Sequence, residues 1–448
     1  MTSGLARLAS RCIFPSFPGD AVPDWIRRFL ADGGGGIVLF AYNVPSRERL
    51  TALNASLRAE RDDVLLAIDE EGGDVTRLEW QSGSSYPAGA ALGAVDDVQL
   101  TEAIGASIAS ELAAAGINWN LAPIADVNVP ANPVIGARAF GSDPALVARH
   151  VAAFVRGTQS RRVAACAKHF PGHGATEKDS HLELPVVTGD VDAGLAPFRA
   201  AIAADVRTIM TAHVRVPALG DTPATLSSAV VQGLLRDELG YGGVVLADAL
   251  EMKAVSETVG IEQSAVRALR AGVDALCVGH DLGEVAVEQI RAALVAHVPE
   301  ARLREAAGRI EALAAWARPV RGGVDHEAGR DAARRALHRE GDLSFDAPPV
   351  IVELRPRANI AAGEAEHTLA SIVVREGEPL PDADVLVVRD AHRHPWMREA
   401  ADVPGIVVVE TGLPVWRPRR SRGYIATNGG SRASLEAARE LLAPGVIA

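Results

Sequence analysis

Cysteine is scarce in this sequence, and the few cysteines present lie far apart. The 448 residues include three, Cys12, Cys166 and Cys277. Two of them, Cys166 and Cys277, sit inside the apolar runs AACAKHF and DALCVGH, where a thiol behaves as a small buried hydrophobic side chain. This spacing argues against a disulfide framework and against a zinc ribbon.

The sequence also lacks a long apolar run and an excess of basic residues. No segment is long enough to cross a bilayer as a helix, and the first 20 residues lack the continuous apolar stretch of a signal peptide. The net charge is -12, so the composition shows no excess of basic residues that would attract nucleic acid or an anionic membrane. These absences predict a cytoplasmic protein that binds neither nucleic acid nor membrane.

Short apolar runs recur through the first three quarters of the chain. Each is nearly continuously apolar, as parallel strands covered on both faces are, and helix-like stretches separate most of them. This alternation predicts a TIM-like (β/α)8 barrel, although the first run contains a proline and is also compatible with a loop. The runs are CIFPSF, GIVLF, VLLAID, INWNLAP, ACAKHF, TIMTAHV, GVVLADAL and DALCVG.

Length and composition predict a second, smaller domain. A chain of 448 residues exceeds one ordinary core, and its composition shifts to Pro, Gly and charge after a helix predicted over residues 301–317. We therefore expect a barrel over residues 1–318, a linker over 319–335 and an open-sheet α/β domain over 336–448. After the shift in composition, EAGRDAARRALHREG and ASLEAARELLAPG predict helices, and PPVIVEL, ADVLVVRD, GIVVVE and GYIATNGG predict strands.

Polar residues follow several of the predicted barrel strands. Asp69 follows VLLAI, Lys168 and His169 follow ACA, His213 follows TIMTA, and Asp248 follows VVLA. Barrel enzymes carry their active sites at the carboxyl ends of the strands, so this distribution predicts an enzyme with one polar rim.

Each of these residues also has a structural interpretation. Asp69 and Asp248 could be helix N-caps, although a carboxylate at the mouth of an apolar barrel also suits a nucleophile. His213 alone is most simply a hydrogen-bonded structural histidine. Lys168 has no comparable structural interpretation, because burying an ammonium group without a partner is costly.

The loop KHFPGHGATEKDSH, residues 168–181, is unusually rich in polar side chains. Metal binding is disfavoured, because Phe170-Pro171-Gly172 keeps His169 and His173 off a common helical face and the HExxH pattern is absent. A solvated surface turn remains an alternative, but it does not explain why the loop continues directly from a strand end that carries a lysine and a histidine.

A catalytic interpretation explains more of the loop. Asp179 could accept a hydrogen bond from one ring nitrogen of His181 and thereby orient the ring and stabilise its imidazolium form. With Asp248 elsewhere on the rim, the site would hold an anionic nucleophile and a proton donor, which is the logic of retaining glycoside hydrolysis. The glycines and prolines would let the loop fold over the barrel mouth.

These motifs together resemble a known family. The loop is similar to the signature of the glycoside hydrolase family 3 β-N-acetylglucosaminidases of the NagZ-like branch, and VIVELRPRANIAAG resembles the second domain of two-domain Gram-positive members. Six further segments agree in order along the chain: GGIVLFAYNV, AIDEEGGDVTRL, NWNLAPIADVN, NPVIGARAFG, MTAHVRVPALGDTPATLS and GYGGVVLADALEM.

The resemblance implies specific residue roles. Asp248 matches the nucleophile, His181 the acid/base and Asp179 its partner, with neither a cofactor nor a metal. Departures from the family pattern occur at Glu251 and Ala137. The residues that match positions holding the sugar hydroxyls and the N-acetyl group are Asp69, Arg77, Arg138, Lys168 and His169, and His213 matches a position near the site.

The implied activity is removal of terminal β-linked N-acetylglucosamine from muropeptides, in peptidoglycan recycling, or from chitooligosaccharides. The expected partner is therefore a small carbohydrate substrate, and the sequence makes no prediction of oligomeric state. A β-N-acetylglucosaminide phosphorylase or a β-glucosidase on the same scaffold is an alternative, since a neutral imidazole would not repel a phosphate acceptor. A non-catalytic sugar-binding protein is disfavoured, because it would have no use for a nucleophile together with a proton donor.

Overall fold

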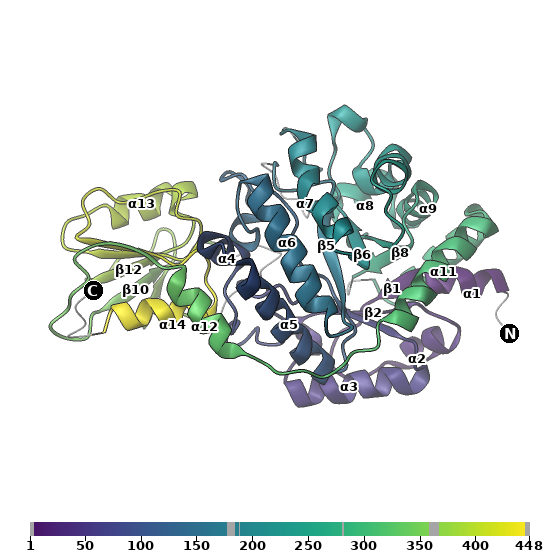
Figure 1. Cartoon of the computed structure of the whole chain (residues 1–448), viewed down its shortest axis with the longest axis horizontal. Helices are drawn as coiled ribbons and strands as arrows, with labels where there is room; N and C mark the ends of the chain where they lie inside the picture. The colour runs from purple at the N-terminus through teal and green to yellow at the C-terminus, as the bar shows by residue number, and fades with distance from the viewer. Residues whose placement is uncertain (1–3, 177–183, 188, 280–281, 358–366, 444–448) are drawn as a thin grey trace.

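The computed structural model of the chain describes residues 4–176, 184–187, 189–279, 282–357 and 367–443. Two sheets organise the molecule, one of eight strands and one of six, and each is accompanied by helices (Figure 1). None of the helices in these described ranges combines the length and apolarity that a membrane span requires.

The larger sheet is a nearly closed parallel barrel. Its order is β1-β8-β7-β6-β5-β4-β3-β2, and β1 and β2, at the two ends of this order, lie side by side (Figure 1). The strands are β1 (Ile13–Pro15), β2 (Gly36–Leu39), β3 (Leu65–Ile68), β4 (Trp119–Asn120), β5 (Ala164–Phe170), β6 (Thr208–Thr211), β7 (Val244–Ala247) and β8 (Ala275–Val278). The predicted barrel is thus confirmed, and the proline-containing first run is a strand that pairs with β8.

Helices connect the barrel strands and form the outer layer. They are α1 (Gly4–Arg11), α2 (Asp24–Ala31), α3 (Arg47–Glu60), α4 (Gly89–Val95), α5 (Val98–Ala114), α6 (Pro144–Gln159), α7 (Val191–Ala203), the wider η5 (Ala229–Glu238), α8 (Lys253–Val259), α9 (Ile261–Ala271), α10 (Glu284–His297) and α11 (Glu300–Trp316). Short 3-10 turns occur at η1 (Ala41–Asn43), η2 (Gly136–Arg138), η3 (Pro217–Leu219), η4 (Ala224–Leu226) and η6 (Ala391–Arg393).

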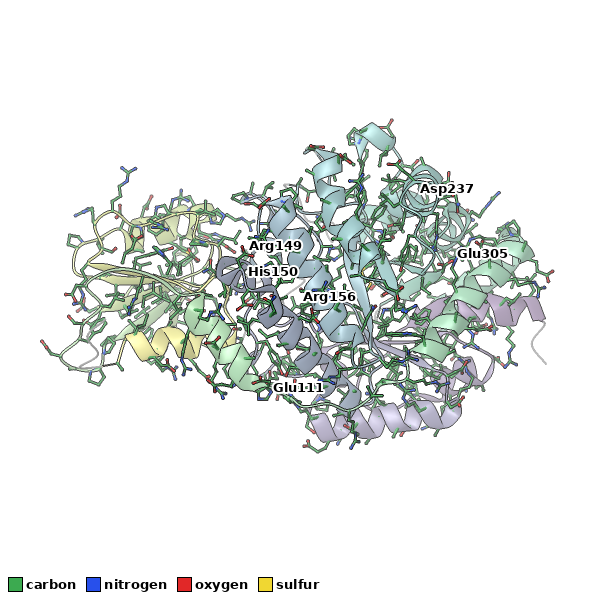
Figure 2. All side chains as sticks on the ribbon, in the orientation of Figure 1. Glu111, Arg149, His150, Arg156, Asp237 and Glu305 are labelled. Atoms are coloured by element: carbon green, nitrogen blue, oxygen red, sulfur yellow. The ribbon has the colours of Figure 1, made fainter. Side chains whose placement is uncertain are left out.

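Helices α5 and α6 illustrate how the outer layer is held. Each begins at an aspartate whose side chain accepts a backbone N–H of the first turn, Asp97 for α5 and Asp143 for α6. Arg156 of α6, labelled in Figure 2, pairs with Glu102 of α5 at 2.9 Å. A Cβ atom at Gly157 would lie 2.1 Å from the Glu102 carbonyl oxygen, so the two backbones approach closely only because residue 157 has no side chain.

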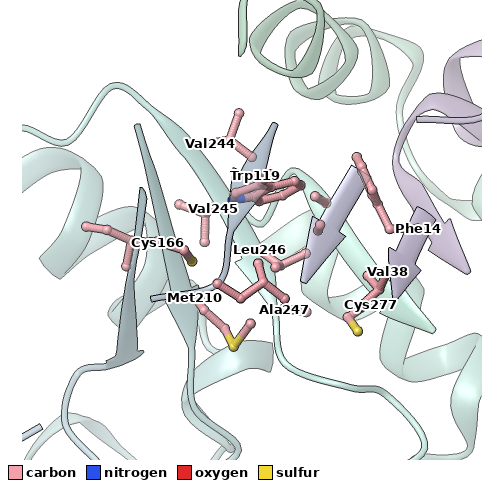
Figure 3. Packing of buried hydrophobic residues seen from close by; sticks show 14 of the residues in the cluster. Phe14, Val38, Trp119, Cys166, Met210, Val244, Val245, Leu246, Ala247 and Cys277 are labelled. Carbon is pink, nitrogen blue, oxygen red and sulfur yellow. The ribbon is translucent and has the colours of Figure 1, made fainter. Parts of the chain in front are cut away.

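Aromatic and aliphatic side chains fill the barrel interior (Figure 3). Phe14 meets the fully buried Trp119 edge-on, with ring centroids 5.4 Å apart, and the indole donates a 2.8 Å hydrogen bond to Thr208 Oγ1. All three cysteines are buried and none is part of a disulfide, as the sequence predicts. Burial raises the pKa of the Cys166 thiol to about 12, so it packs as a neutral side chain.

The second sheet is open, as predicted. Its order is β11-β10-β12-β13-β14-β9, and every pair is parallel except β14 with β9. The strands are β9 (His338–Gly341), β10 (Ile351–Leu354), β11 (Ile372–Val374), β12 (Val385–Val388), β13 (Val407–Glu410) and β14 (Gly423–Ala426). The accompanying helices are α12 (His326–Arg335), which lies in the predicted linker, α13 (Pro395–Ala401) and α14 (Arg432–Leu441).

Two elements of this domain differ from the sequence prediction. The helix predicted over EAGRDAARRALHREG ends at Arg335, and residues His338–Gly341 form the edge strand β9. All four residues of β9 are exposed, so their hydrogen bonds to β14, and not their own hydrophobic pattern, make them a strand. Strand β11 was not predicted, because its three residues are mostly exposed and give no apolar run of core type.

Candidate active site

The polar residues predicted for the barrel rim lie at the carboxyl ends of its strands. Asp69 follows β3, and Asp248 follows β7. Lys168 and His169 are the two residues before the last residue of β5, Phe170, where the predicted apolar run also ends. Phe170 pairs with Thr211 of β6, and Thr211 pairs with Ala247 of β7, so the ends of these three strands are level with one another.

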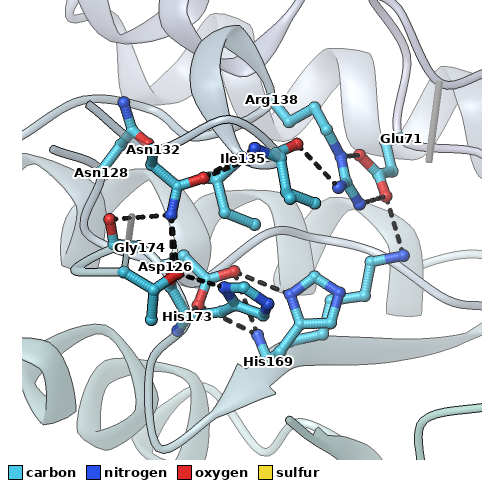
Figure 4. A network of polar contacts seen from close by, with 12 residues as sticks. Glu71, Asp126, Asn128, Asn132, Ile135, Arg138, His169, His173 and Gly174 are labelled. Carbon is cyan, nitrogen blue, oxygen red and sulfur yellow. Dashed lines mark hydrogen bonds and ion pairs between the residues drawn. The ribbon is translucent and has the colours of Figure 1, made fainter. Parts of the chain in front are cut away.

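Lys168 is the centre of a buried charged network. Its Nζ atom lies 2.6 Å from Asp69 Oδ1 and 2.8 Å from Glu71 Oε1, and Glu71 forms a bidentate pair with Arg138 at 2.7 and 2.9 Å (Figure 4). The Lys168 side chain is only 3% exposed. The cost expected for a buried ammonium is thus offset by two carboxylates.

The pKa values in this network follow from the pairing. Burial alone would lower the pKa of Lys168, but the charges of Asp69 and Glu71 outweigh it and raise this pKa. Burial alone would raise the pKa of Glu71, but Arg138 and Lys168 outweigh it and hold this pKa well below its usual range. Lys168, Glu71 and Arg138 are therefore charged at neutral pH. Glu71 was not among the predicted site residues, although it stands in the EEGG that follows Asp69.

A tight loop brings Arg77 back toward Asp69. Arg77 Nη2 lies 3.9 Å from Asp69 Oδ2. Between them, the buried Glu70 accepts the backbone N–H groups of Arg77 and Leu78 at 2.8 and 2.9 Å, and burial raises the pKa of Glu70 to about 7. The loop thus places two of the predicted sugar-binding residues on the same side of the rim.

Asp126 anchors the first part of the 168–181 loop. Its Oδ2 atom lies 2.8 Å from His169 Nδ1, and its Oδ1 accepts the backbone N–H of His173 at 2.6 Å (Figure 4). Burial alone would raise the pKa of Asp126, but the interaction with His169 outweighs it and lowers this pKa. Asp126 was also missed as a site residue. Its only sequence signal is its place in NWNLAPIADVN, after a predicted strand.

His173 is held on both its backbone and its ring. Asn132 Nδ2 donates to the His173 carbonyl oxygen at 2.8 Å, and His173 Nδ1 lies 2.9 Å from Thr176 Oγ1. In the ranges that the structure describes, no group of three or more His, Cys, Asp or Glu residues is arranged to hold a metal ion. The two histidines of this segment instead contact protein groups.

We expect His173 to make the protein less stable in mild acid. Burial, with the neighbouring His169, lowers the pKa of His173 from 6.5 to about 4. Between pH 6.5 and pH 4, His173 is protonated in the unfolded chain but not in the folded chain. The free energy of unfolding therefore falls as the pH drops through this range, by up to about 3 kcal/mol. Urea unfolding between pH 7 and pH 4.5 measures this slope, and His173→Gln should reduce it.

His297→Gln, which replaces an exposed histidine of α10, is the matched control and should keep the wild-type slope. An unchanged slope in folded His173→Gln would contradict the assignment.

Asp248 follows β7, and His213 contacts the next residue, Ala249. Asp248 is half-buried, and its Oδ1 accepts the backbone N–H of Ala249 at 2.8 Å. His213 is fully buried, with Nε2 3.0 Å from the Ala249 carbonyl oxygen and Nδ1 2.9 Å from Thr225 Oγ1. His213 therefore supports the backbone beside Asp248, as its structural interpretation proposed.

Asp248 shares its surroundings with the charged network. Burial raises the pKa of the Cys277 thiol, and the charges of Glu251, Asp248 and Asp69 raise it further. Burial also raises the pKa of the Cys166 thiol, Lys168 lowers this pKa, and the charges of Asp69 and Asp248 raise it. Asp69 follows β3 and Asp248 follows β7, so the two carboxylates lie at the same end of the barrel.

Asp179 and His181 lie outside the residues that the structure describes, and their roles stay predictions. The chain on either side of them is anchored at the rim. Val186 forms a parallel bridge with Arg215, and Val187 N donates to the Arg215 carbonyl oxygen at 2.9 Å. The loop that carries both residues thus leaves from β5 and returns beside the segment that follows β6.

A mostly apolar cavity lies beside the first part of the 168–181 loop, from Pro171 to Ala175. Its polar side chains are Ser142 and Asp190, and Asp190 is the N-cap of α7. The lining residues are Val127, Val129, Ser142, Pro144, Pro171, Gly172, Gly174, Ala175, Val187, Gly189, Asp190, Val191, Ala193, Gly194 and Val216. The cavity does not include the charged network, so it is a feature separate from the polar rim.

Comparison with known proteins assigns the family. Residues 23–313 match the glycosyl hydrolase family 3 N-terminal domain. The chain belongs to glycosyl hydrolase family 3. Membership confirms the resemblance found in the sequence, and the chain is accordingly a glycoside hydrolase with a two-domain fold.

The relatives differ in how much of this chain they cover. A β-hexosaminidase from Bordetella avium is 38% identical over an alignment of 269 residues, and the match covers 57% of this chain and 77% of that protein. The structure of a family 3 β-N-acetylglucosaminidase from Paenibacillus sp. FPU-7 is 31% identical with a TM-score of 0.86, and the alignment covers 98% of this chain and 96% of that one. NagZ from Neisseria gonorrhoeae, in complex with N-trifluoroacetyl-D-glucosamine, is 30% identical with a TM-score of 0.62, over 71% of this chain and 92% of that one.

Proposed function

We propose that this glycoside hydrolase is a retaining β-N-acetylhexosaminidase that removes terminal β-linked N-acetylglucosamine. The observation that carries the proposal is the position of the half-buried Asp248 at the same barrel end as the network of Lys168, Asp69, Glu71 and Arg138. A carboxylate nucleophile beside a cluster of fixed hydrogen-bonding groups is what a sugar-cleaving site requires. The relatives named β-hexosaminidase and β-N-acetylglucosaminidase supply the sugar.

The reaction would proceed by double displacement. Asp248 forms a bond to the anomeric carbon while the bond from that carbon to the aglycone oxygen breaks, and the imidazolium of His181 gives its proton to the departing oxygen. Water then attacks the same carbon, returns a proton to His181 and releases Asp248. Asp179 would orient the His181 ring and stabilise its charged form.

The rim groups would bind the sugar. Hydrogen bonds from hydroxyl groups to ionised side chains are stronger than those between neutral groups, and the network offers both carboxylates and cations. We assign contacts with the hydroxyls and the N-acetyl group to Asp69, Arg77, Arg138, Lys168 and His169. His213 would act through Ala249, since its ring nitrogens already contact protein groups.

Muropeptides fit the histidine acid/base best among the candidate substrates. A neutral imidazole does not repel an anion near the scissile bond as a second carboxylate would, and muropeptides carry lactyl or peptide carboxylates. Chitooligosaccharides lack such a charge, so a preference for anionic aglycones separates the two classes.

The function is tested by turnover of an aryl β-N-acetylglucosaminide beside the matching aryl β-glucoside. We expect strong preference for the N-acetyl substrate and release of the free sugar whether or not phosphate is present. Preference for the glucoside would overturn the sugar assignment. A sugar 1-phosphate product that requires phosphate would make the enzyme a phosphorylase.

His181→Ala should affect substrates according to their leaving groups. Loss of the proton donor is expected to slow natural disaccharides by about 10²–10⁴-fold and nitrophenyl glycosides much less, because an acidic phenol leaves without protonation. Initial rates on both substrates measure the difference, with His297→Ala as the control. An equal loss on both substrates would exclude His181 as the acid.

A further inference from the structure

In the second domain, residues that follow three of the strands contact barrel loops that carry candidate sugar-binding residues. Arg389 follows β12 and Gly430 follows β14, and both contact Asp74 of the loop after β3. Leu413, after β13, packs on an apolar cluster that includes Ala137, the neighbour of Arg138. The second domain lies beside α4 in Figure 1.

The contact with Asp74 is a bidentate ion pair between a buried carboxylate and the half-buried guanidinium of Arg389. Arg389 Nη2 lies 2.7 Å from Asp74 Oδ2, and Arg389 Nη1 lies 3.1 Å from Oδ1. Gly430 N donates to the same Oδ1 at 3.0 Å, and the Asp74 side chain is only 5% exposed. Two strand ends of the second domain therefore converge on one barrel carboxylate. A bidentate pair whose carboxylate is desolvated fixes geometry more firmly than a fully exposed ion pair does.

Asp74 lies within a tight turn between Glu71 and Arg77. Glu71 N donates to the Val75 carbonyl oxygen at 3.0 Å, and Val75 N donates to the Gly72 carbonyl oxygen at 3.3 Å. Gly73 has a φ of +63°, and a Cβ there would lie 2.5 Å from Ala88 Cα. Since the turn is short, hydrogen-bonded and closely packed, a displacement of Asp74 would also displace Glu71 and Arg77.

A second cation of the same domain holds the far side of this loop. Arg432, at the start of α14, pairs with Glu79 at 2.9 Å and donates to Ser85 Oγ at 2.5 Å. His392 Nε2 lies 2.9 Å from the carbonyl oxygen of Pro130, in the loop whose Asn132 holds His173. The domain thus contacts both loops that flank the polar rim.

We propose that the second domain positions the sugar-binding loop, and that Arg389 is a positioning residue for the reaction. Through Asp74, Arg389 holds Glu71 and Arg77 in place relative to Lys168. The inference rests on the proposed function for the role of Arg77 in binding, whereas the mechanical link between Arg389 and the loop does not.

The test removes the ion pair without leaving a buried charge unpaired. Arg389→Gln alone would strand the Asp74 carboxylate and could unfold the protein, so the informative variant is Asp74→Asn with Arg389→Gln. The matched control is Arg335→Gln. Arg335 pairs with Asp97 at 2.9 Å, which also joins α12 to the barrel but lies outside the loop between Asp69 and Arg77.

We expect the double variant to raise KM for the aryl N-acetylglucosaminide by about tenfold or more, with kcat within about threefold of wild type, because misplaced binding groups weaken substrate binding. Without substrate, the amides of Arg77 and Leu78 should exchange with deuterium faster than in wild type. The thermal midpoint should stay near that of wild type, and the control should leave KM and exchange unchanged.

Each outcome decides the proposal. A folded double variant with unchanged KM overturns the positioning role, whether or not exchange changes, and unchanged exchange overturns the mechanical link. If wild type cleaves no N-acetylglucosaminide, the proposed function fails, and amide exchange still decides whether Arg389 holds the loop.

Discussion

Asp248→Ala is expected to lower kcat on aryl β-N-acetylglucosaminide by about 10⁴-fold or more, which corresponds to about 5.5 kcal/mol of transition-state stabilisation. The reason is that the proposed covalent intermediate forms on this carboxylate, and no other group replaces a missing nucleophile. Asp248 has the required position, after β7 and half-buried, with its carboxylate oriented by the backbone N–H of Ala249. Steady-state kinetics with protein free of wild-type contamination measures the loss.

Glu251→Gln is the matched control for this experiment. Glu251 carries a carboxylate three residues further along the same loop, where it accepts the backbone N–H of Gly279 at 3.0 Å. Its loss should cost less than about tenfold in kcat, because a glutamine oxygen can still accept that hydrogen bond. Comparable losses of kcat in both variants would show that either substitution acts by disturbing the conformation of this loop. Asp248 would then no longer be supported as the nucleophile.

Lys168→Met is expected to lower kcat/KM by about 10²–10³-fold, which is about 3–4 kcal/mol. The variant keeps most of the side-chain volume but removes the ammonium group that lies between Asp69 and Glu71. Glu71 would keep Arg138 as its partner, whereas Asp69 would keep, among the residues that the structure describes, only the Arg77 ion pair at 3.9 Å. Asp69 should then reorient, and both sugar binding and folding stability should fall.

Saturation kinetics and urea unfolding together test this prediction. Lys253→Met is the control, because Lys253 is an exposed residue of α8 whose ion pair with Glu257 spans 3.7 Å, and surface pairs of this kind contribute little. Wild-type kcat/KM in a folded Lys168→Met protein would contradict a role for the network in substrate binding. A loss of stability with unchanged kinetics would assign the network to folding alone.

Burial accounts for much of what sequence reasoning found at this site and for part of what it missed. Lys168 was singled out because an unpaired buried ammonium is costly, and the structure supplies Asp69 and Glu71 as its partners. Glu71 and Asp126 were missed, because an acidic residue after a strand looks the same in sequence whether it caps a helix or binds a cation. The partner of Glu71, Arg138, is 67 positions away, so no local pattern links them.

The second domain shows the same limit at the level of secondary structure. Strands β10, β12, β13 and β14 were predicted because they are apolar, and all but β10 are fully buried. Strand β9 was predicted as helix, since its exposed HREG residues continue a helix-like composition. Its extended conformation depends on hydrogen bonds to β14, more than 80 positions away.

The sequence by itself determined the barrel, the open second sheet and the end of the barrel at which polar residues collect. These features can be predicted because a parallel strand covered on both faces has a continuous apolar sequence, and all parallel strands of a barrel end on the same rim. Only the tertiary structure decided which charges meet. Asp74 and Arg389 are 315 positions apart, and a pairing that depends on a separation of about 3 Å exists only once both domains have folded and docked.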